Sequence, residues 1–217
     1  MLESLFKHSL DAFSDDYKAL CKHHYPTIHN RGMSPAHLSS AFHRRLTSLA
    51  TDKGLPINCS LFLHDVDHHL YIYTLLIDTK KVWCIYPLFL NAKTEAKTQI
   101  LLSINKLLND GELHKEDYVA VLCDHWFDRT RSSKALYHWW NGHLPAAFES
   151  YAEQGIQHLP SEDNFAAIVE ERFELACLNH SIYHPLESNQ QHALLKYFLC
   201  FALFQYPKNQ DTFFLLT

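Results

Sequence analysis

Imidazole and carboxylate side chains are concentrated between residues 64 and 69, where the sequence reads HDVDHH. The candidate metal ligands are His64, Asp65, His68 and His69. This mixture of ligands suits Zn²⁺ or Mn²⁺, provided that a turn brings three of them to one point. With an open coordination position, the group would form the site of a His/Asp metal hydrolase. A solvated turn between two strands explains the same residues without a metal, and both interpretations stay open.

A second group could do metal-dependent phosphodiester chemistry. Asp78 precedes a Glu-Ala-Lys triplet that runs from Glu95 to Lys97. Two carboxylates can hold Mg²⁺ or Mn²⁺, and a nearby lysine can orient the attacking water. The catalytic residues of such a nuclease would be Asp78, Glu95 and Lys97. The alternative is structural, because Pro87 indicates that the preceding strand ends before residue 94. Glu95 would then lie in the first turn of a helix, where an acid complements the helix dipole.

A third group lies at and after the end of the strand-like run YVAVLCD (118–124). An acid and a histidine at the carboxyl end of a strand often face a cleft and can act as an acid/base or ligand pair. Aromatic rings beside arginines can stack on bases, which makes nucleic acid a candidate partner. At helical spacing the same aromatic residues also fit core packing. The candidate binding residues are Asp124, His125, Arg129, Arg131, Trp139 and Trp140.

Length and composition predict one globular domain. The chain has 217 residues, 47% of them hydrophobic, and a formal net charge of −5 with histidine neutral. It therefore lacks the overall basic field that steers proteins to nucleic acid phosphates. Seventeen histidines make its charge strongly pH-dependent below neutrality. We divide the domain 1–217 into N-terminal helices (1–54), a sheet core (55–128) and a helical region (129–217).

Cysteine usage and hydropathy predict a cytoplasmic protein without a membrane segment. The six cysteines are scattered in apolar runs, as expected for buried thiols in a reducing compartment. The N-terminus lacks the pattern of a signal peptide. The most apolar run, YFLCFALF at 197–204, is far shorter than the roughly 20 residues that span a bilayer.

Hydrophobic periodicity predicts the elements that position these groups. Ser34 and Pro35 suit the start of a helix that stops before Gly54. The expected helices cover residues 2–21, 35–53, 94–109, 132–140, 145–154, 161–178 and 188–205. The expected strands cover 59–64, 70–78, 82–90 and 118–123, the last parallel to an earlier strand because a helix connects them. Ser161 and Ser188 are expected N-caps, and the TFFLLT segment at 212–217 could be an edge strand.

Three of these segments carry a family resemblance. They read RGMSPAHLSSAFHRRL (31–46), YIYTLLID (71–78) and VWCIYPLFL (82–90). They are similar to bacterial members of the restriction-endonuclease-like (PD-(D/E)xK) superfamily. In those proteins a similar helix precedes a strand reading roughly HIDALLID and a strand reading IIFIEAKRL. The resemblance covers about residues 30–128. It implies an α/β fold with a mixed four- to five-stranded sheet flanked by helices, to which we add a helical C-terminal region.

The resemblance places neutral residues where the nuclease signature would stand. Tyr73 falls at the position of the aspartate, and Tyr86 and Leu88 fall at those of the glutamate and lysine. We therefore expect a non-catalytic binding or interaction protein on a nuclease-like scaffold, linked to a mobile-element, defence or immunity system. No cofactor is expected, and a protein partner or self-association is. An exposed apolar patch for the partner is expected on helix 2–21 or in the C-terminal region. The alternatives are the metal-dependent nuclease, with Mg²⁺ or Mn²⁺, and the metal hydrolase.

Overall fold

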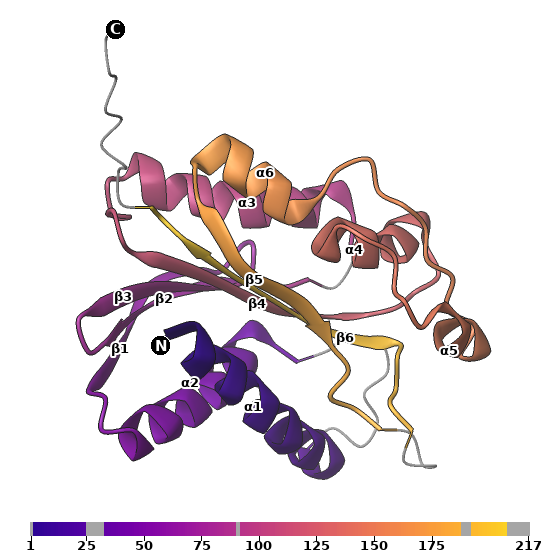
Figure 1. The fold of residues 1–217 in the computed structure, drawn as a ribbon, viewed down its shortest axis with the longest axis horizontal. Helices are drawn as coiled ribbons and strands as arrows, with labels where there is room; N and C mark the ends of the chain where they lie inside the picture. The colour runs from indigo at the N-terminus through magenta and orange to yellow at the C-terminus, as the bar shows by residue number, and fades with distance from the viewer. Residues whose placement is uncertain (1, 25–32, 90–91, 188–191, 208–217) are drawn as a thin grey trace, which may run out of the picture.

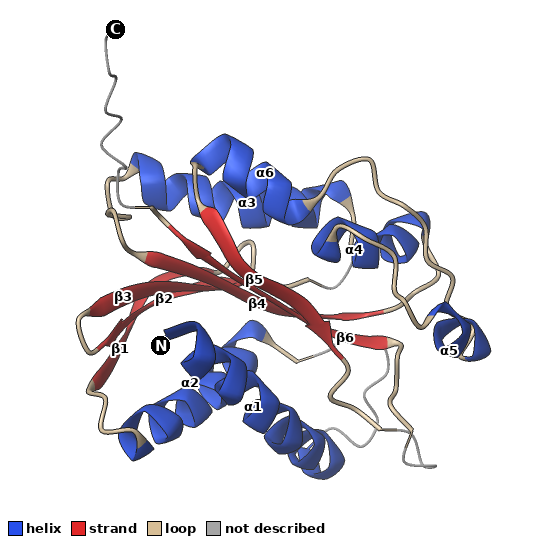
Figure 2. Cartoon of the chain, in the orientation of Figure 1, coloured by secondary structure: helices blue, strands red, loops and turns tan. Residues whose placement is uncertain are grey.

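A six-stranded mixed sheet separates two layers of helices in the computed structural model, which describes residues 2–24, 33–89, 92–187 and 192–207 (Figure 1). The expected class, an α/β fold with a mixed sheet flanked by helices, is confirmed. The sheet has six strands, rather than four or five. Helices α1 and α2 cover one face of the sheet, and α3, α4 and α6 cover the other (Figure 2).

Twelve elements follow one another along the chain. The helices are α1 (Leu2–His24), α2 (Pro35–Asp52), α3 (Thr94–Asn109), α4 (Arg131–Asn141), α5 (Phe148–Glu153) and α6 (Phe165–Phe173). The strands are β1 (Ile57–Asp65), β2 (Leu70–Ile77), β3 (Lys80–Tyr86), β4 (Tyr118–Trp126), β5 (Ala176–Tyr183) and β6 (Tyr197–Gln205).

The strands lie in the order β1-β2-β3-β4-β6-β5. Strands β1, β2 and β3 form an antiparallel meander, and α3 then connects β3 to β4, which is parallel to β3 as expected. The parallel pairing extends only from Val82 opposite Tyr118 to Ile85 opposite Val121. Beyond that point the second half of β4 is paired with β6 alone, among the described residues. The carboxyl ends of β3 and β4 therefore diverge.

The two N-terminal helices form where the sequence predicts them. Ser34 caps α2 by accepting a hydrogen bond from the His37 backbone N–H, and Pro35 occupies the first turn. The apolar stripe of α1, which includes Phe6 and Phe13, is buried against α2 and the sheet. The expectation of an exposed apolar patch on helix 2–21 is therefore wrong.

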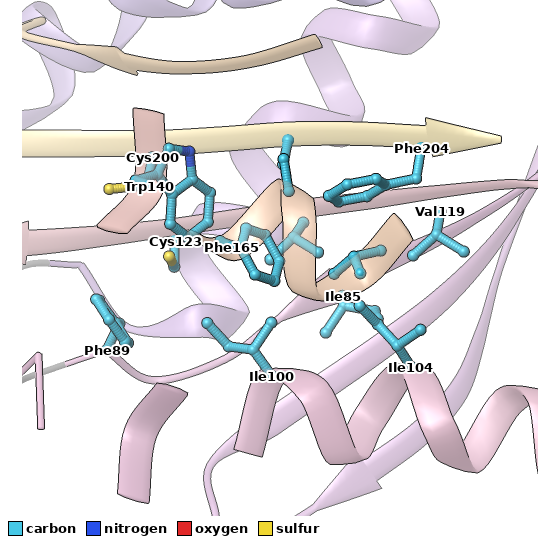
Figure 3. Close-up of a cluster of buried hydrophobic side chains, with 14 of the residues drawn as sticks. Ile85, Phe89, Ile100, Ile104, Val119, Cys123, Trp140, Phe165, Cys200 and Phe204 are labelled. Atoms are coloured by element: carbon cyan, nitrogen blue, oxygen red, sulfur yellow. The ribbon is translucent and has the colours of Figure 1, made fainter. Parts of the chain in front are cut away.

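The larger core fills the space between the sheet and the α3, α4 and α6 layer. Figure 3 shows side chains of the strands, among them Ile85 and Phe204, facing Ile100 and Ile104 of α3. Trp140 of α4 and Phe165 of α6 pack into the same cluster, with their ring centroids 4.9 Å apart. This packing fixes where α3 and α4 begin relative to the sheet.

The C-terminal region is not purely helical, which corrects the expectation for 129–217. The segment 188–205 was expected as a buried helix, but Tyr197–Gln205 is strand β6. A strand buried on both faces is apolar at successive positions, so its sequence cannot be distinguished by periodicity from a buried helix. Helix α6 is capped by Asn164 rather than Ser161 and ends at Phe173, before β5. Ser188 and the TFFLLT segment lie outside the described residues.

None of the helices in the described part of the chain combines the length and the apolar character needed to cross a bilayer.

Candidate functional site

The HDVDHH segment forms the end of β1 and the turn to β2. The Asp65 carboxylate lies 2.9 Å from His68 Nδ1 and also accepts a hydrogen bond from the His68 backbone N–H at 3.1 Å. The ring of His64 instead stacks on Tyr71, with centroids 4.1 Å apart, because alternate residues of a strand point to opposite faces. Across residues 2–24, 33–89, 92–187 and 192–207, no three His, Cys, Asp or Glu side chains are grouped so that they could hold a metal. The four expected ligands, His69 included, do not converge.

The expected nuclease residues are also separated. Asp78 lies in the turn between β2 and β3, at the start of β3, whereas Glu95 and Lys97 lie in the first turn of α3, after the end of β3. A seven-residue strand spans roughly 20 Å. The carboxylates of Asp78 and Glu95 therefore cannot share one cation. The proposed catalytic trio is wrong as a single site, although Lys97 reappears below.

Four neutral side chains meet between α2 and the strands β1, β2 and β3, in a group that we call the His43 cluster: His43, Cys59, Tyr73 and Tyr86. His43 Nε2 lies 2.7 Å from the Tyr86 hydroxyl, and its Nδ1 lies 3.4 Å from Cys59 Sγ. The Tyr73 ring meets the His43 ring edge to face, with centroids 4.7 Å apart. Sequence reasoning identified Tyr73 and Tyr86, but it missed His43 because nothing in AFHRR distinguishes a buried histidine from an exposed one.

Burial disfavours the charged forms of His43, Cys59 and Tyr86. It lowers the pKa of His43 to about 4, raises the pKa of Cys59, and raises that of Tyr86 well above its usual value. A hollow of about 420 Å³ beside His43 and Tyr73 is open to solvent and also lined by Arg44. The cluster offers hydrogen bonds but no anionic oxygen ligands for a hard cation.

Asp124 and His125 do not form a pair, because they point to opposite faces of β4. Asp124 is buried beneath α1 and accepts hydrogen bonds from the Met33 backbone N–H (2.6 Å), the Tyr197 hydroxyl (2.6 Å) and the Tyr17 hydroxyl (3.3 Å). Burial raises its pKa to about 6, against the opposing effect of these donors. The expected acid/base pair is therefore wrong.

His125 faces the α3 and α4 layer and is hydrogen-bonded inside the core. Its Nδ1 lies 3.3 Å from the Phe89 carbonyl and its Nε2 lies 2.8 Å from the Ser133 hydroxyl. Burial lowers its pKa, so the neutral ring is favoured. His125 thus ties β4 to the first turn of α4 and has a positioning role.

The two tryptophans of α4 are core residues rather than an exposed stacking surface. Trp140 packs on Phe165, and its indole N–H donates to the Phe201 carbonyl at 3.1 Å. Trp139 is 1% exposed and also stacks on Phe165, with centroids 5.0 Å apart. Trp140 is therefore excluded as a binding residue, and Trp139 can contribute only from beneath the surface.

Three of the expected residues, Lys97, Arg131 and Trp139, line one surface groove. This groove, which we call the α3–α4 groove, has a volume of about 590 Å³. Helices α3 and α4 form two of its walls, and the segment before α6 forms a third. Its lining residues are Thr94, Lys97, Thr98, Leu101, Arg131, Ser132, Ala135, Trp139, Pro160, Ser161, Glu162, Asp163 and Ile168. Residues from two separate groups of sequence candidates therefore meet in this groove.

The groove lies where two helices begin, outside the carboxyl ends of the parallel strands β3 and β4. The backbone N–H groups in the first turns of α3 and α4 give this end of the groove a partial positive charge. Lys97 is half-buried, with its Nζ 4.6 Å from the centroid of the Trp139 ring, and burial lowers its pKa. Arg131 is exposed at the start of α4, whereas Arg129 precedes the helix in a left-handed conformation and does not line the groove. Glu162 and Asp163 lie on the wall before α6.

Fold and site together define an α/β protein with an open mixed sheet and a groove that carries positive side chains. No protein-family model matches the chain, and no curated protein matches it. Among solved structures, the chain is similar to a humanized D. rerio TDP2 that carries 14 mutations, with 10% sequence identity. The similarity covers 90% of this chain and 93% of that chain, and its TM-score of 0.34 is too low to indicate a shared fold.

Proposed function

We propose that this chain is a non-catalytic binding protein whose α3–α4 groove takes a nucleoside phosphate or a similar phosphate-bearing ligand. One observation carries the proposal: Lys97 and Arg131 line the same groove at which α3 and α4 begin. Backbone N–H groups at helix starts and cationic side chains are the donors that phosphate groups use.

Lys97 supports a phosphate position in particular. Within the described chain, no carboxylate forms an ion pair with its ammonium group, which is half-buried over the Trp139 ring. The lowered pKa of Lys97 reflects the cost of removing that charge from water. Asp163 opposes this cost only in part, since its attraction raises the pKa of Lys97 less than burial lowers it. A bound phosphate would offset more of the cost, and Arg131 could bind two of the phosphate oxygens.

The remainder of the groove supports a ligand that is not anionic along its whole length. Leu101, Ala135 and Ile168 supply apolar surface for an organic part of the ligand. Glu162 and Asp163 would repel further phosphates but can accept hydrogen bonds from hydroxyl groups, such as those of a ribose. The negative net charge of the chain also argues against a long nucleic acid duplex.

The His43 cluster supports the non-catalytic part of the proposal. Neutral Tyr73 and Tyr86 stand where the resemblance places the acids of a nuclease. The chain order α2, antiparallel β1-β2-β3, α3 and parallel β4 supports the restriction-endonuclease-like scaffold. A link to a mobile-element, defence or immunity system rests on that resemblance alone.

Titration calorimetry with inorganic pyrophosphate, ATP and a short single-stranded DNA tests the groove. We expect ATP to bind, and Lys97→Met and Arg131→Ala each to weaken binding by about ten-fold, as expected for loss of a charged hydrogen bond. Arg129→Ala is the matched control, because this neighbouring arginine does not line the groove, and its affinity should equal that of the wild type. The proposal would be overturned if none of the three probes bound at millimolar concentration. It would also be overturned if Lys97→Met and Arg131→Ala bound ATP as tightly as the wild type.

A cleavage assay tests the non-catalytic part separately. Plasmid and single-stranded DNA are incubated with the protein and Mg²⁺ or Mn²⁺, beside a Glu95→Ala variant. We expect no cleavage by either protein. Metal-dependent cleavage that is lost in the variant would show instead that Glu95 belongs to a nuclease site.

A further inference from the structure

Strand β1 forms an open edge of the sheet with an unusual lack of charge. It is nine residues long and, within the described chain, it pairs only with β2. From Ile57 to Leu63 it carries no charged residue and no proline. Natural edge strands are commonly protected by lysine, proline, a bulge or a covering helix, since unpaired backbone groups otherwise bind another strand. The register of β1 to β2 shifts between Leu61 and Leu63, so the regular part of this uncharged edge runs from Ile57 to Leu61. The backbone groups on the open side of β1 are therefore available to pair with another strand.

Apolar side chains are exposed on both faces beside this edge. Leu61 is 53% exposed and lies opposite Tyr73, on the side of α2. Phe62 is 38% exposed and contacts the edge of Trp83, on the side of α3. Leu76 is 47% exposed and lies next to Asn58 on that same side. The side chains of an added strand would pack beside Leu61 on one face and Phe62 on the other, whereas a helix on one face would contact only one of them.

We propose that β1 is the interface of a homodimer, in which β1 of a second copy pairs with it in antiparallel orientation about a two-fold axis at Ser60. Opposite residues of an antiparallel pair share a face. This register places Leu61 beside Cys59 of the second copy, both on the α2 side. It also places Phe62 beside Asn58 of the second copy, both on the α3 side, so that the two sheets become one.

The charges at the two ends of β1 favour a second copy in this orientation. Three cations and two acids lie near its Ile57 end: Lys53, Lys80, Lys81, Asp52 and Asp78. At its other end lie Asp65 and Asp67, in a segment (64–69) that contains three histidines and no lysine or arginine. Antiparallel pairing brings the positive end of each copy to the negative end of the other, while parallel pairing would oppose like charges. Complementary ends select orientation in this way.

Sedimentation velocity of the full chain over a concentration series tests the dimer. A single pair of edge strands is a small interface, so we expect dissociation in about the micromolar range. The double variant Leu61→Lys/Phe62→Lys should raise the dissociation constant by at least about ten-fold, because it places charges on the edge. The matched control is Leu144→Lys/Phe148→Lys, which alters two similarly exposed apolar residues away from β1 and should leave dimerisation unchanged. A monomer at several hundred micromolar, or equal weakening by both variants, would overturn the proposal.

Disulfide trapping tests the register without disturbing the edge. In a Cys59→Ser background, Ser60→Cys places the two thiols directly opposite each other, within the range of a disulfide. Asn58→Cys is the control, since the same register separates its two thiols by about four residues along the strand, roughly 13 Å. Oxidation should cross-link the first variant and not the second. Equal cross-linking of both would exclude this register, and so would the absence of cross-linking in Ser60→Cys.

Discussion

The two faces of the sheet treat their polar groups in opposite ways around the carboxyl end of β4. On the α1 and α2 face, Asp124 and His43 are buried and have hydrogen-bond partners. Burial raises the pKa of Asp124 and lowers that of His43, which in each case favours the neutral form. On the α3 and α4 face, Lys97 and Arg131 border an open groove. Asp124 and His43 thus have hydrogen-bond partners within the chain, while Lys97 forms no ion pair among the described residues and has only the weaker attraction of Asp163. This difference is the basis of our proposal that the α3–α4 groove, rather than the opposite face, binds a ligand.

The two neighbouring residues of β4 illustrate the same contrast. Asp124 accepts hydrogen bonds from Tyr17 of α1, from Tyr197 of β6 and from the backbone N–H of Met33, which lies just before α2. His125 is held by the Phe89 carbonyl and the Ser133 hydroxyl, which anchors the first turn of α4 beside the groove. Asp124 thus holds the segments that cover the α1 and α2 face together, whereas His125 positions α4, which forms a wall of the α3–α4 groove.

Introducing an acid into the His43 cluster is expected to have the largest effect and tests whether this face tolerates a charge. Tyr86→Glu should destabilise the fold by about 3–5 kcal/mol, because it buries a carboxyl group among neutral side chains. Urea denaturation at pH 7.5 measures this loss. Tyr86→Phe is the matched control and should cost only about 1 kcal/mol, the value of its hydrogen bond to His43. If Tyr86→Glu kept wild-type stability and Mg²⁺ raised its Tm, this face would still be able to form a metal site.

The pH dependence of stability probes the buried imidazole of the same face. Its folded pKa of about 4 lies below the unfolded value of 6.5, so protonation is disfavoured in the native state. The His43 contribution is therefore present above pH 6.5 and is lost as the pH falls from 6.5 toward 4. The loss is at most about 3 kcal/mol. His43→Gln should show a shallower decline between pH 7.5 and 4.5 in urea titrations, and an unchanged slope would mean that the ring is open to water.

Asp124 should show the opposite sign. Its folded pKa of about 6 lies above the unfolded value of 3.8, so its contribution is present below pH 3.8 and is lost as the pH rises through 6. The stability of Asp124→Asn relative to the wild type should therefore increase by about 2–3 kcal/mol between pH 4 and pH 7.5. Paired urea titrations at both pH values measure this change. A constant difference would show that the carboxylate is fully compensated by its donors.

The smallest effect on stability is expected in the groove. Lys97→Met keeps an unbranched side chain over the Trp139 ring and removes a cation without an ion-pair partner in the described chain. We expect its free energy of unfolding to stay within about 0.5 kcal/mol of the wild type. Together with weaker ATP binding, this result would separate recognition from folding. A loss of several kcal/mol would instead make Lys97 a structural residue.

Local signals in the sequence predicted part of this molecule correctly. The Ser34 cap, the helix at 94–109 and the parallel strand at 118 all depend on patterns that short segments carry by themselves. Strand β6 was missed because central burial on both faces removes the alternation that identifies a strand. Local patterns also cannot show which chain segment lies beside which.

The candidate site shows that limit most clearly. Lys97, Arg131 and Trp139 were each identified, but as members of two unrelated groups. Their meeting depends on the packing of α3 against α4 and α6, which no spacing in the sequence encodes. His43 was missed for the same reason, since only the tertiary fold brings it to Tyr86 and Cys59.

The place of β6 also determines when the molecule can be completed during its synthesis. This strand is the last described element, yet it lies between β4 and β5 and pairs with both. Until residue 205 has been made, the flanks of those two earlier strands have no neighbour to join them. A nascent chain therefore carries β4 with one open flank from residue 126 until β6 is made, and an unpaired apolar strand of this kind is prone to aggregation.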